Sequence, residues 1–231
     1  MIVSINQPAY LPWLGYFERI ASSDLHIVLD HVQFEKNSMT NRNKLRTSQG
    51  WSWLTVPVSS SGKFGNMAIS DVNIPLNTRW QKKHWNSIRS SYSKSEYFAL
   101  HERFFESIYS REWEKLDLLI GEITNYLLQS IGIATPLMLS SEMAPLQSKS
   151  ELVLELCLKA GADCYLSGAM GRDYLDLDAF RLNGIEVQFQ EYRHPQYRQL
   201  HGEFLPYMSV IDLLFNEGPN SLKILTGDTP E

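Results

Sequence analysis

Residues 2–29 read IVSINQPAYLPWLGYFERIASSDLHIVL, and this stretch decides the fold. Residues 2–5 form a β-branched run that ends just before Pro8, as a buried strand does where it enters a loop. Apolar side chains then recur at the spacing of one helix face over residues 13–21, and residues 25–29 form a second apolar run. The stretch therefore predicts a strand, loop, helix and strand, the unit with which a nucleotide-binding parallel sheet begins.

The rest of the chain extends this pattern with further strands and helices. Residues 51–58 and 67–74 resemble two antiparallel strands, and helical periodicity follows at 80–92, 97–109 and 114–131. The last third alternates again, with strands at 135–139, 164–166 and 185–189 and helices at 150–160 and 173–182. We predict a single α/β domain over residues 1–231. Its mostly parallel, Rossmann-like sheet is flanked by helices and carries a helical cap insertion at about residues 78–131.

Composition limits the classes of function. The net charge of −5 argues against a nucleic-acid partner, whose binding would need many cations on phosphates. The two cysteines and six histidines show no metal-ligand spacing, so we predict no metal site and a reducing compartment. The amino-terminal residues lack signal-peptide features, and no apolar run reaches the roughly 20 residues that cross a bilayer. We therefore expect a cytoplasmic protein without membrane insertion.

The loop after the first strand is the first candidate site. It places Asn6 and Gln7 at the end of the strand, just before a helix start whose free N–H groups suit a phosphate or carboxylate. Tyr10 and Trp13 complete the predicted substrate contacts. The competing interpretation is a rigid turn fixed by prolines, with its aromatic side chains in the core. Spacing alone favours neither interpretation.

The second candidate site follows the second strand, which Asp30 closes and after which comes Gln33. Four consecutive polar residues come next, namely Asn41, Arg42, Asn43 and Lys44. Two amides and two cations in a row can hold a phosphate or carboxylate group of a substrate. A solvated polar turn is the alternative for this segment.

The third candidate is a glycine loop between a strand and a helix. We predict phosphate binding there by Ser167, Gly168, Gly171 and Arg172, because glycines let the backbone approach a ligand closely. The loop matches neither the dinucleotide-binding fingerprint nor the P-loop. It mirrors the first loop, since both would lie at carboxyl ends of parallel strands, where open α/β sheets bind ligands.

Catalysis needs a proton acceptor, and His84 is the candidate, because the pKa of an unperturbed imidazole lies near neutrality. Asp30 is the second predicted catalytic residue. An ordinary histidine on a helix surface is the alternative for His84. Tyr197 and Gln199 are predicted to line the same site from the carboxyl-terminal region.

Several strings together resemble one known family, the WbqC-like family. They are QPxYLPWxGYF at 7–17, DxVQF at 30–34, NRN at 41–43, WLTVPV at 53–58, YLSG at 165–168 and SxxDLLFN at 209–216. The resemblance spans roughly residues 2–218 and implies a role among genes for O-antigen and other surface glycans. It further implies acyl or aminoacyl transfer that forms an amide on the amino group of a nucleotide-linked amino-deoxy sugar. The donor is open.

Two other functions compete with amide formation. The first strand, loop and helix are similar to the start of the nucleotidylyltransferase and pantothenate-synthetase superfamily, which uses ATP. Both histidines of that superfamily's His-x-Gly-His motif are missing here, since Gly15-Tyr16 stands where some of those enzymes have Gly-His. The other alternative is a non-catalytic partner that binds a nucleotide sugar. The apolar helix around Leu213 is also compatible with a homodimer.

Overall fold

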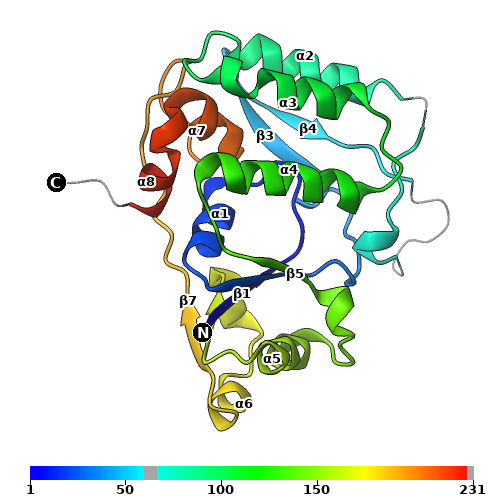
Figure 1. The fold of residues 1–231 in the computed structure, drawn as a ribbon, viewed down its shortest axis with the longest axis vertical. Helices are drawn as coiled ribbons and strands as arrows, with labels where there is room; N and C mark the ends of the chain where they lie inside the picture. Colours follow the sequence, from blue (N-terminus) through cyan, green and yellow to red (C-terminus); the bar gives the residue numbers. More distant parts are fainter. Residues whose placement is uncertain (60–66, 77, 228–231) are drawn as a thin grey trace.

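The computed structural model describes residues 1–59, 67–76 and 78–227. Its centre is a five-stranded sheet in the order β5-β2-β1-β6-β7 (Figure 1). The strands are β1 (Ile2–Asn6), β2 (Leu25–Val28), β5 (Leu137–Leu139), β6 (Cys164–Ser167) and β7 (Glu186–Phe189). All neighbouring pairs in this sheet are parallel. The predicted α/β fold with a mostly parallel sheet is confirmed.

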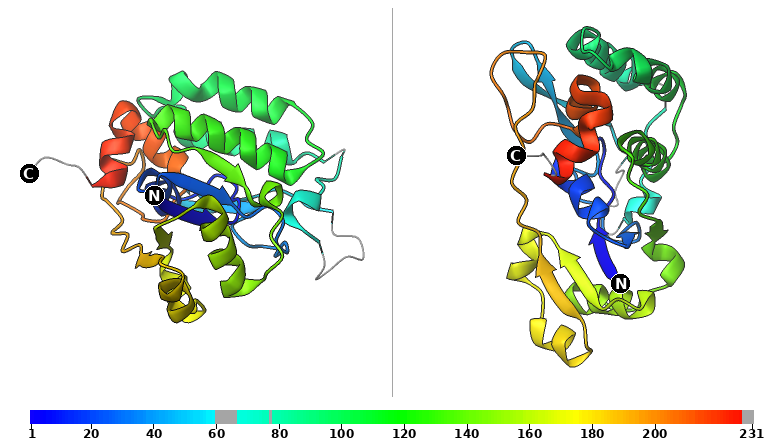
Figure 2. Two further views of the ribbon diagram at one scale, coloured as in Figure 1. Left: turned by 60° about the horizontal axis from the view of Figure 1, so that its bottom comes forward. Right: turned by 60° about the vertical axis from the view of Figure 1, so that its left-hand side comes forward.

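Helices cover both faces of the sheet. On one face lie α1 (Leu14–Ala21) and α4 (Leu116–Ile131), and on the other lie α5 (Lys149–Ala160) and α6 (Leu177–Leu182), as the left view of Figure 2 shows for α4 and α5. Successive side chains of β1 point to opposite faces of the sheet. Val3 packs in the core formed with α5 and α6. Ser4 points to the other face, where it is hydrogen-bonded to His26, and the ring of His26 contacts Tyr16 of α1.

The order of the strands creates a switch point. From β1 the chain moves outward to β2 and β5, whereas β6 and β7 lie on the other side of β1. Connections from β1 and β6 therefore leave on opposite faces of the sheet, and a crevice at their carboxyl ends is the usual ligand position in such folds.

The predicted middle helices form, but the predicted cap insertion is not confirmed. The helices α2 (Trp80–Tyr92), α3 (Phe98–Ser110) and α4 share one hydrophobic core with α1 and with α7 (Val210–Glu217). A short helix, α8 (Ser221–Thr226), follows α7 and packs on α1. The middle helices therefore continue the main body of the protein.

A hairpin corrects the prediction for the second polar segment. Residues 42–47 form β3 (Arg42–Thr47), which pairs antiparallel with β4 (Gly50–Thr55). Residues 67–76 contribute a short helical turn, η1 (Ile69–Asp71), and isolated bridges instead of the predicted strand. The sequence pattern did not predict β3, because one face of this strand carries cationic residues and the other has few apolar ones. The loop predicted between residues 58 and 67 lies largely outside the described residues.

The helix α7, the apolar helix predicted around Leu213, lies inside the protein. Its residues Val210 to Phe215 are at most 1% exposed, and Leu213 is fully buried. The helix thus offers no apolar face to a second subunit. The homodimer stays a prediction, and α7 does not support it. Within the described residues no helix is both long and apolar enough to cross a membrane.

Candidate functional site

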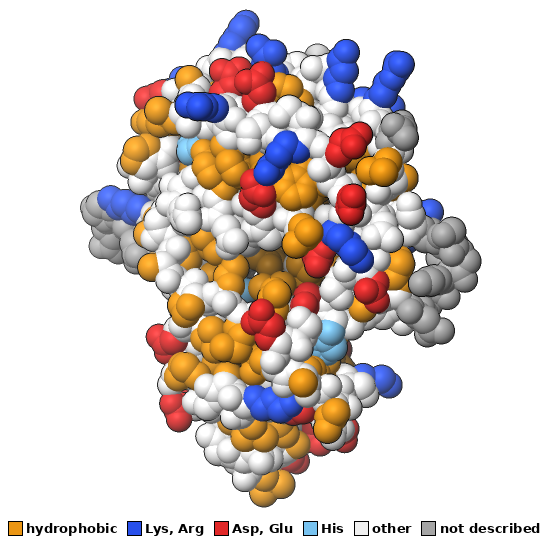
Figure 3. All heavy atoms as spheres, turned by 45° about the vertical axis from the view of Figure 1, so that its right-hand side comes forward, with side chains coloured by type: hydrophobic (Ala, Val, Ile, Leu, Met, Phe, Trp, Pro, Cys, Tyr) orange, Lys and Arg blue, Asp and Glu red, His pale blue; other side chains and the backbone are white. Residues whose placement is uncertain are grey.

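A pocket of about 550 Å³ lies between α4 and the carboxyl ends of β2 and β5. Its floor is apolar, with Val28, Leu137 and Leu139 on the sheet and Tyr16 on α1. Figure 3 shows the hollow on this face of the molecule, with hydrophobic side chains inside it and acidic side chains around it. Both the position at the ends of parallel strands and the volume are typical of a small-molecule site.

Among the described residues, all charged side chains that line the pocket are acidic: Asp30, Asp117, Glu122 and Glu142. Glu122 is neutralised by an ion pair with Arg111, whereas the ion pairs among the described residues include no partner for the other three. The pocket therefore carries a surplus of negative charge at neutral pH. Such a surplus favours a cationic ligand group. No three His, Cys, Asp or Glu side chains among the described residues are arranged to hold a metal ion.

Asp30, one of the predicted catalytic residues, lines this pocket as a firmly held carboxylate. It accepts hydrogen bonds from the Ser140 hydroxyl (2.9 Å), the Ser141 N–H (2.9 Å) and the Ser141 hydroxyl (2.5 Å). Burial alone would raise the pKa of Asp30, but these hydrogen bonds outweigh it and hold the pKa below its ordinary value. Asp30 thus stays ionised and anchors the turn η2 (Ser140–Met143) at the pocket.

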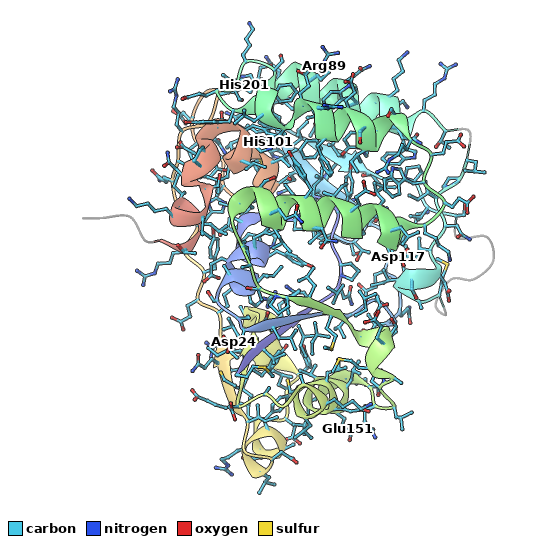
Figure 4. All side chains as sticks on the ribbon, in the orientation of Figure 1. Asp24, Arg89, His101, Asp117, Glu151 and His201 are labelled. Atoms are coloured by element: carbon cyan, nitrogen blue, oxygen red, sulfur yellow. The ribbon has the colours of Figure 1, made fainter. Side chains whose placement is uncertain are left out.

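Asp117 has the opposite electrostatic character. It lies in the first turn of α4, at the amino-terminal end of that helix (Figure 4), where it bonds the N–H of Leu118. Burial raises the pKa of Asp117, the charge of Asp30 adds to the rise, and the Leu118 N–H and Lys115 oppose it. A half-buried carboxylate with a raised pKa is suited to accept and release a proton.

The two predicted loop sites meet at the switch point. Asn6 ends β1, and its amide oxygen accepts a hydrogen bond from Arg19 of α1 at 2.5 Å. Gly168 follows β6 and lies directly beside the same guanidinium. The predicted residues Asn6 and Gly168 are therefore brought together, and a cation that the prediction missed lies between them.

The other residues of the glycine loop are placed less favourably for a ligand. Ser167 is 1% exposed, and its hydroxyl points back to the carbonyl oxygen of Gly168. A side chain at Gly171 would meet the Ser167 hydroxyl at 2.1 Å, so this glycine serves the close turn. Arg172 lies over the Phe189 ring and pairs with Glu191 at 3.5 Å on the surface. Their predicted roles in phosphate binding stay predictions.

The predicted base His84 lies in the core. It is 5% exposed, and its Nδ1 lies 2.8 Å from the hydroxyl of Tyr10, another predicted contact, which in turn bonds Tyr109. Burial lowers the pKa of His84 to about 4, against an opposing hydrogen bond to the Thr55 backbone. Tyr10 itself is fully buried. Neither side chain belongs to the pocket lining, and neither takes part in the function proposed below.

The buried histidines predict how stability depends on pH. Burial holds the pKa of His84 at about 4 and that of His26 at about 3, below the ordinary 6.5. As the pH falls below 6.5, these two histidines become protonated in the unfolded chain but stay neutral in the folded protein, so the free energy of unfolding decreases. We expect the free energy of unfolding from urea titrations to drop by about 2–3 kcal/mol from about pH 7.5 to about pH 5.5. In the variant His84→Gln the loss should shrink by about half; an unchanged loss would contradict this assignment.

The second polar segment divides between core and surface. Asn41 and Asn43 are buried and donate to the carbonyl oxygens of Val56 and Leu11. Arg42 and Lys44 project from the other face of β3, where Arg42 lies 4.4 Å from the Trp53 ring centre. These cations lie on the hairpin, and the pocket lining includes neither.

The remaining predicted contacts are spread over other parts of the surface and core. The side chains of Tyr197 and Gln199 donate to Asp212 at 2.8 Å each and so hold the carboxyl-terminal segment to α7. Trp13 packs edge to face on Tyr192, 5.4 Å between ring centres. Gln7 and Gln33 are exposed. The structure therefore gathers only some of the predicted residues at the strand ends.

Two residues of the candidate site escaped the sequence analysis. Arg19 comes three residues after the buried Tyr16 and four after the buried Gly15, so it lies beside the inner face of α1. A charged residue at such a position was the feature of the sequence that could have indicated a functional role. Asp117 resembles an ordinary acidic residue in the first turn of a helix. No local pattern could reveal that α4 crosses above β2.

Comparison with known proteins agrees with the resemblance found in the sequence. The model of the WbqC-like protein family matches residues 7–224. A similar chain is the protein from Mycobacterium tuberculosis named "Uncharacterized protein Rv1507c", which is 38% identical over 218 residues, 94% of each chain. No solved structure gives a significant match. Because the family match and the relative both cover nearly the whole chain, this protein belongs to the WbqC-like protein family.

Proposed function

We propose that this protein is an enzyme of surface-polysaccharide biosynthesis that transfers an acyl or aminoacyl group to the amino group of a nucleotide-linked amino-deoxy sugar, forming an amide. One observation carries the proposal: the pocket at the carboxyl ends of β2 and β5 has an apolar floor, and the charged side chains that line it in the described part of the chain are all acidic. The family resemblance supports the choice of an amino sugar as substrate.

The lining of the pocket fits the two faces of such a sugar. A deoxy sugar presents C–H groups that can lie on the aliphatic side chains of the floor, beside the largely buried Tyr16. An amino substituent is protonated at neutral pH and is attracted by the surplus carboxylates. The fixed negative charge of Asp30 would hold the ammonium group while Glu142 stays exposed at the pocket's rim.

Amide formation requires the ammonium group to lose a proton before it attacks. We assign that proton to Asp117, whose raised pKa makes it a better acceptor than Asp30. The free amine then forms a C–N bond to the carbonyl carbon of an activated donor, a thioester or ester. The bond from that carbon to sulfur or oxygen breaks, and the leaving group takes the electron pair. The second proton of the nitrogen goes to the leaving group, which balances the reaction.

Affinity for matched sugars tests the role of the pocket. A nucleotide-linked amino sugar should bind at least about tenfold more tightly than the same sugar with a hydroxyl in place of the amine, since an ion pair in a partly buried site outweighs a neutral hydrogen bond. Isothermal titration calorimetry at neutral pH measures both dissociation constants. Equal affinities, or tighter binding of the hydroxyl sugar, would contradict the proposal.

The two alternatives give different outcomes with the same purified protein. An ATP-dependent nucleotidylyltransferase would release diphosphate or form an adenylate when ATP is supplied. A non-catalytic partner would show a raised melting temperature with the nucleotide sugar and no product with any donor. The acidic pocket argues against ATP phosphates inside it, because they would bring negative charge to a surplus of carboxylates. The pocket suits the amino sugar in both remaining cases, so formation of a product separates the transferase from the non-catalytic partner.

A further inference from the structure

Arg19 extends from α1 across the carboxyl edge of the sheet at the switch point. Its Nη2 donates to the amide oxygen of Asn6 at the end of β1, and its Nη1 lies beside Gly168 at the end of β6. The side chains of a helix lean toward its amino terminus, which brings the long guanidinium group up to the strand ends. Arg19 therefore joins the two strands that flank the switch point.

The charge of this guanidinium group is not neutralised. Arg19 forms none of the ion pairs found among the described residues. Its acidic neighbour Glu18 is itself bonded by Gln190 and by Ser22. Burial lowers the pKa of Arg19, whereas the neighbouring Tyr165, Tyr16 and Tyr174 and the charge of Glu18 oppose that fall without forming an ion pair with the guanidinium group. Burying a cation without a paired anion costs free energy. An anionic ligand that binds Arg19 is the simplest explanation for a buried arginine at this position.

Unpartnered donors point to the same conclusion. The Nε of Arg19 and the Nδ2 of Asn6 are buried, and residues 1–59, 67–76 and 78–227 provide no hydrogen-bond acceptor for either. Both groups can only donate, and buried donors in native proteins nearly always find an acceptor. The Nη1 also makes none of the hydrogen bonds found here, and it is absent from the fully buried unpartnered atoms, so it faces accessible space. An oxyanion supplies what all of these donors lack.

Gly168 is required for this arrangement. A Cβ atom at this position would lie 2.2 Å from the Nη1 of Arg19. The backbone of Gly168 has φ −70° and ψ 163°, which every residue adopts easily, so conformational freedom is not the reason for a glycine. Its absence of a side chain leaves room for the guanidinium group and for a ligand beside it.

We propose that Arg19, Asn6 and Gly168 form an oxyanion-binding site that receives the diphosphate of the nucleotide-linked substrate. The site adjoins the acidic pocket: Asn6 pairs with Val28, which lines the pocket, and Tyr16 lines the pocket within electrostatic range of Arg19. A ligand with an anionic diphosphate and a cationic amine would match both sites at once. The choice of a diphosphate rests on the proposed function, whereas the anion site stands on its own geometry.

Binding of simple anions to the whole protein tests the site. We expect inorganic pyrophosphate and a nucleoside diphosphate to bind, and Arg19→Gln to weaken both by about tenfold or more, as loss of a charged hydrogen-bonding partner does. Gly168→Ala should weaken them to a similar degree, because its methyl group displaces the guanidinium while every charge remains. The exposed Arg181, in an ion pair on α6, gives the matched control Arg181→Gln, whose affinity should equal that of the wild type.

Each outcome decides one part of the inference. If the wild type binds no anion, or if pyrophosphate binds Arg19→Gln and Gly168→Ala as tightly as the wild type, the site is refuted. If acetate is bound through Arg19 and pyrophosphate is not, the oxyanion site stands but its occupant is a carboxylate. If pyrophosphate binding depends on Arg19 while amino and hydroxyl sugars bind equally, the proposed function fails and the anion site survives. Melting temperatures of both variants confirm that they are folded.

Discussion

The variant Asp117→Asn should lower kcat/KM for amide formation by about 100-fold or more, the usual loss when a general base is removed. The asparagine oxygen can still accept the hydrogen bond from the N–H of Leu118, so α4 should keep its first turn and the melting temperature should change little. What the variant cannot do is take the proton of the substrate ammonium group. Initial rates over a range of sugar concentrations measure the effect.

A matched carboxylate outside the pocket provides the control for this variant. Glu106 is exposed on α3, so Glu106→Gln removes the same charge without touching the pocket. Its kcat/KM should remain that of the wild type. Raising the pH should also restore part of the activity of Asp117→Asn, since a growing fraction of the amine is then already deprotonated. Equal kcat/KM values for Asp117→Asn and the wild type would show that Asp117 is not the base.

The variant Asp212→Ala should cost about 3–5 kcal/mol in the free energy of unfolding, the range found when one partner of a buried charged network is removed. Asp212 is fully buried on α7 and accepts hydrogen bonds from Tyr92 (2.9 Å), Tyr197 (2.8 Å) and Gln199 (2.8 Å). Burial raises the pKa of Asp212, although these bonds oppose the rise. Its removal leaves the hydroxyls of Tyr92 and Tyr197 without an acceptor and Gln199 with only the carbonyl oxygen of Leu205.

Urea denaturation of Asp212→Ala and of a surface variant gives the comparison. Asp178 pairs with Arg181 on α6, where both side chains are about four-fifths exposed. Asp178→Ala should therefore change the free energy of unfolding by at most about 1 kcal/mol. A loss for Asp212→Ala as small as that for Asp178→Ala would mean that the network contributes little to stability.

The sequence predicted the parallel sheet well because its strands are locally marked. Residues 2–5 and 25–29 are apolar runs closed by turn residues, and the observed β1 (Ile2–Asn6) and β2 (Leu25–Val28) agree within one residue at each end. The helix over 13–21 likewise appears as α1 (Leu14–Ala21). In these segments the local pattern and the global fold favour the same structure.

The hairpin shows where local pattern is insufficient. Residues 42–47 read RNKLRT, with one aliphatic residue, and cross-strand contacts with Trp51 and Trp53 stabilise them as a strand. These contacts join positions on two strands, so no count of apolar residues within β3 could predict them. The strand predicted at residues 67–74 was wrong for the opposite reason: their apolar side chains, those of η1 included, join the core beside α4 without pairing with another strand.

The candidate site was predictable only in part for the same physical reason. The strand ends identified Asn6, Asp30 and Gly168, because parallel strands bring their carboxyl ends to one edge. Asp117 lies on a helix more than eighty residues after Asp30 in the sequence. It reaches the pocket because the packing of the whole hydrophobic core positions α4, which no local pattern predicts. The buried position of His84 could not be predicted, because a polar residue on a helix of mixed composition gives no sign of facing inward, where it lies against Tyr10.

The central claim is that the protein joins an acyl group to the amine of a nucleotide-linked sugar, and mass spectrometry of the reaction products tests it most directly. The protein would be incubated with a nucleotide-linked amino sugar that it binds and with acyl and aminoacyl thioesters and esters. We expect a sugar heavier by the acyl group minus one hydrogen, formed by the wild type and nearly absent with Asp117→Asn. An unmodified sugar with every donor, despite tight binding, would contradict it.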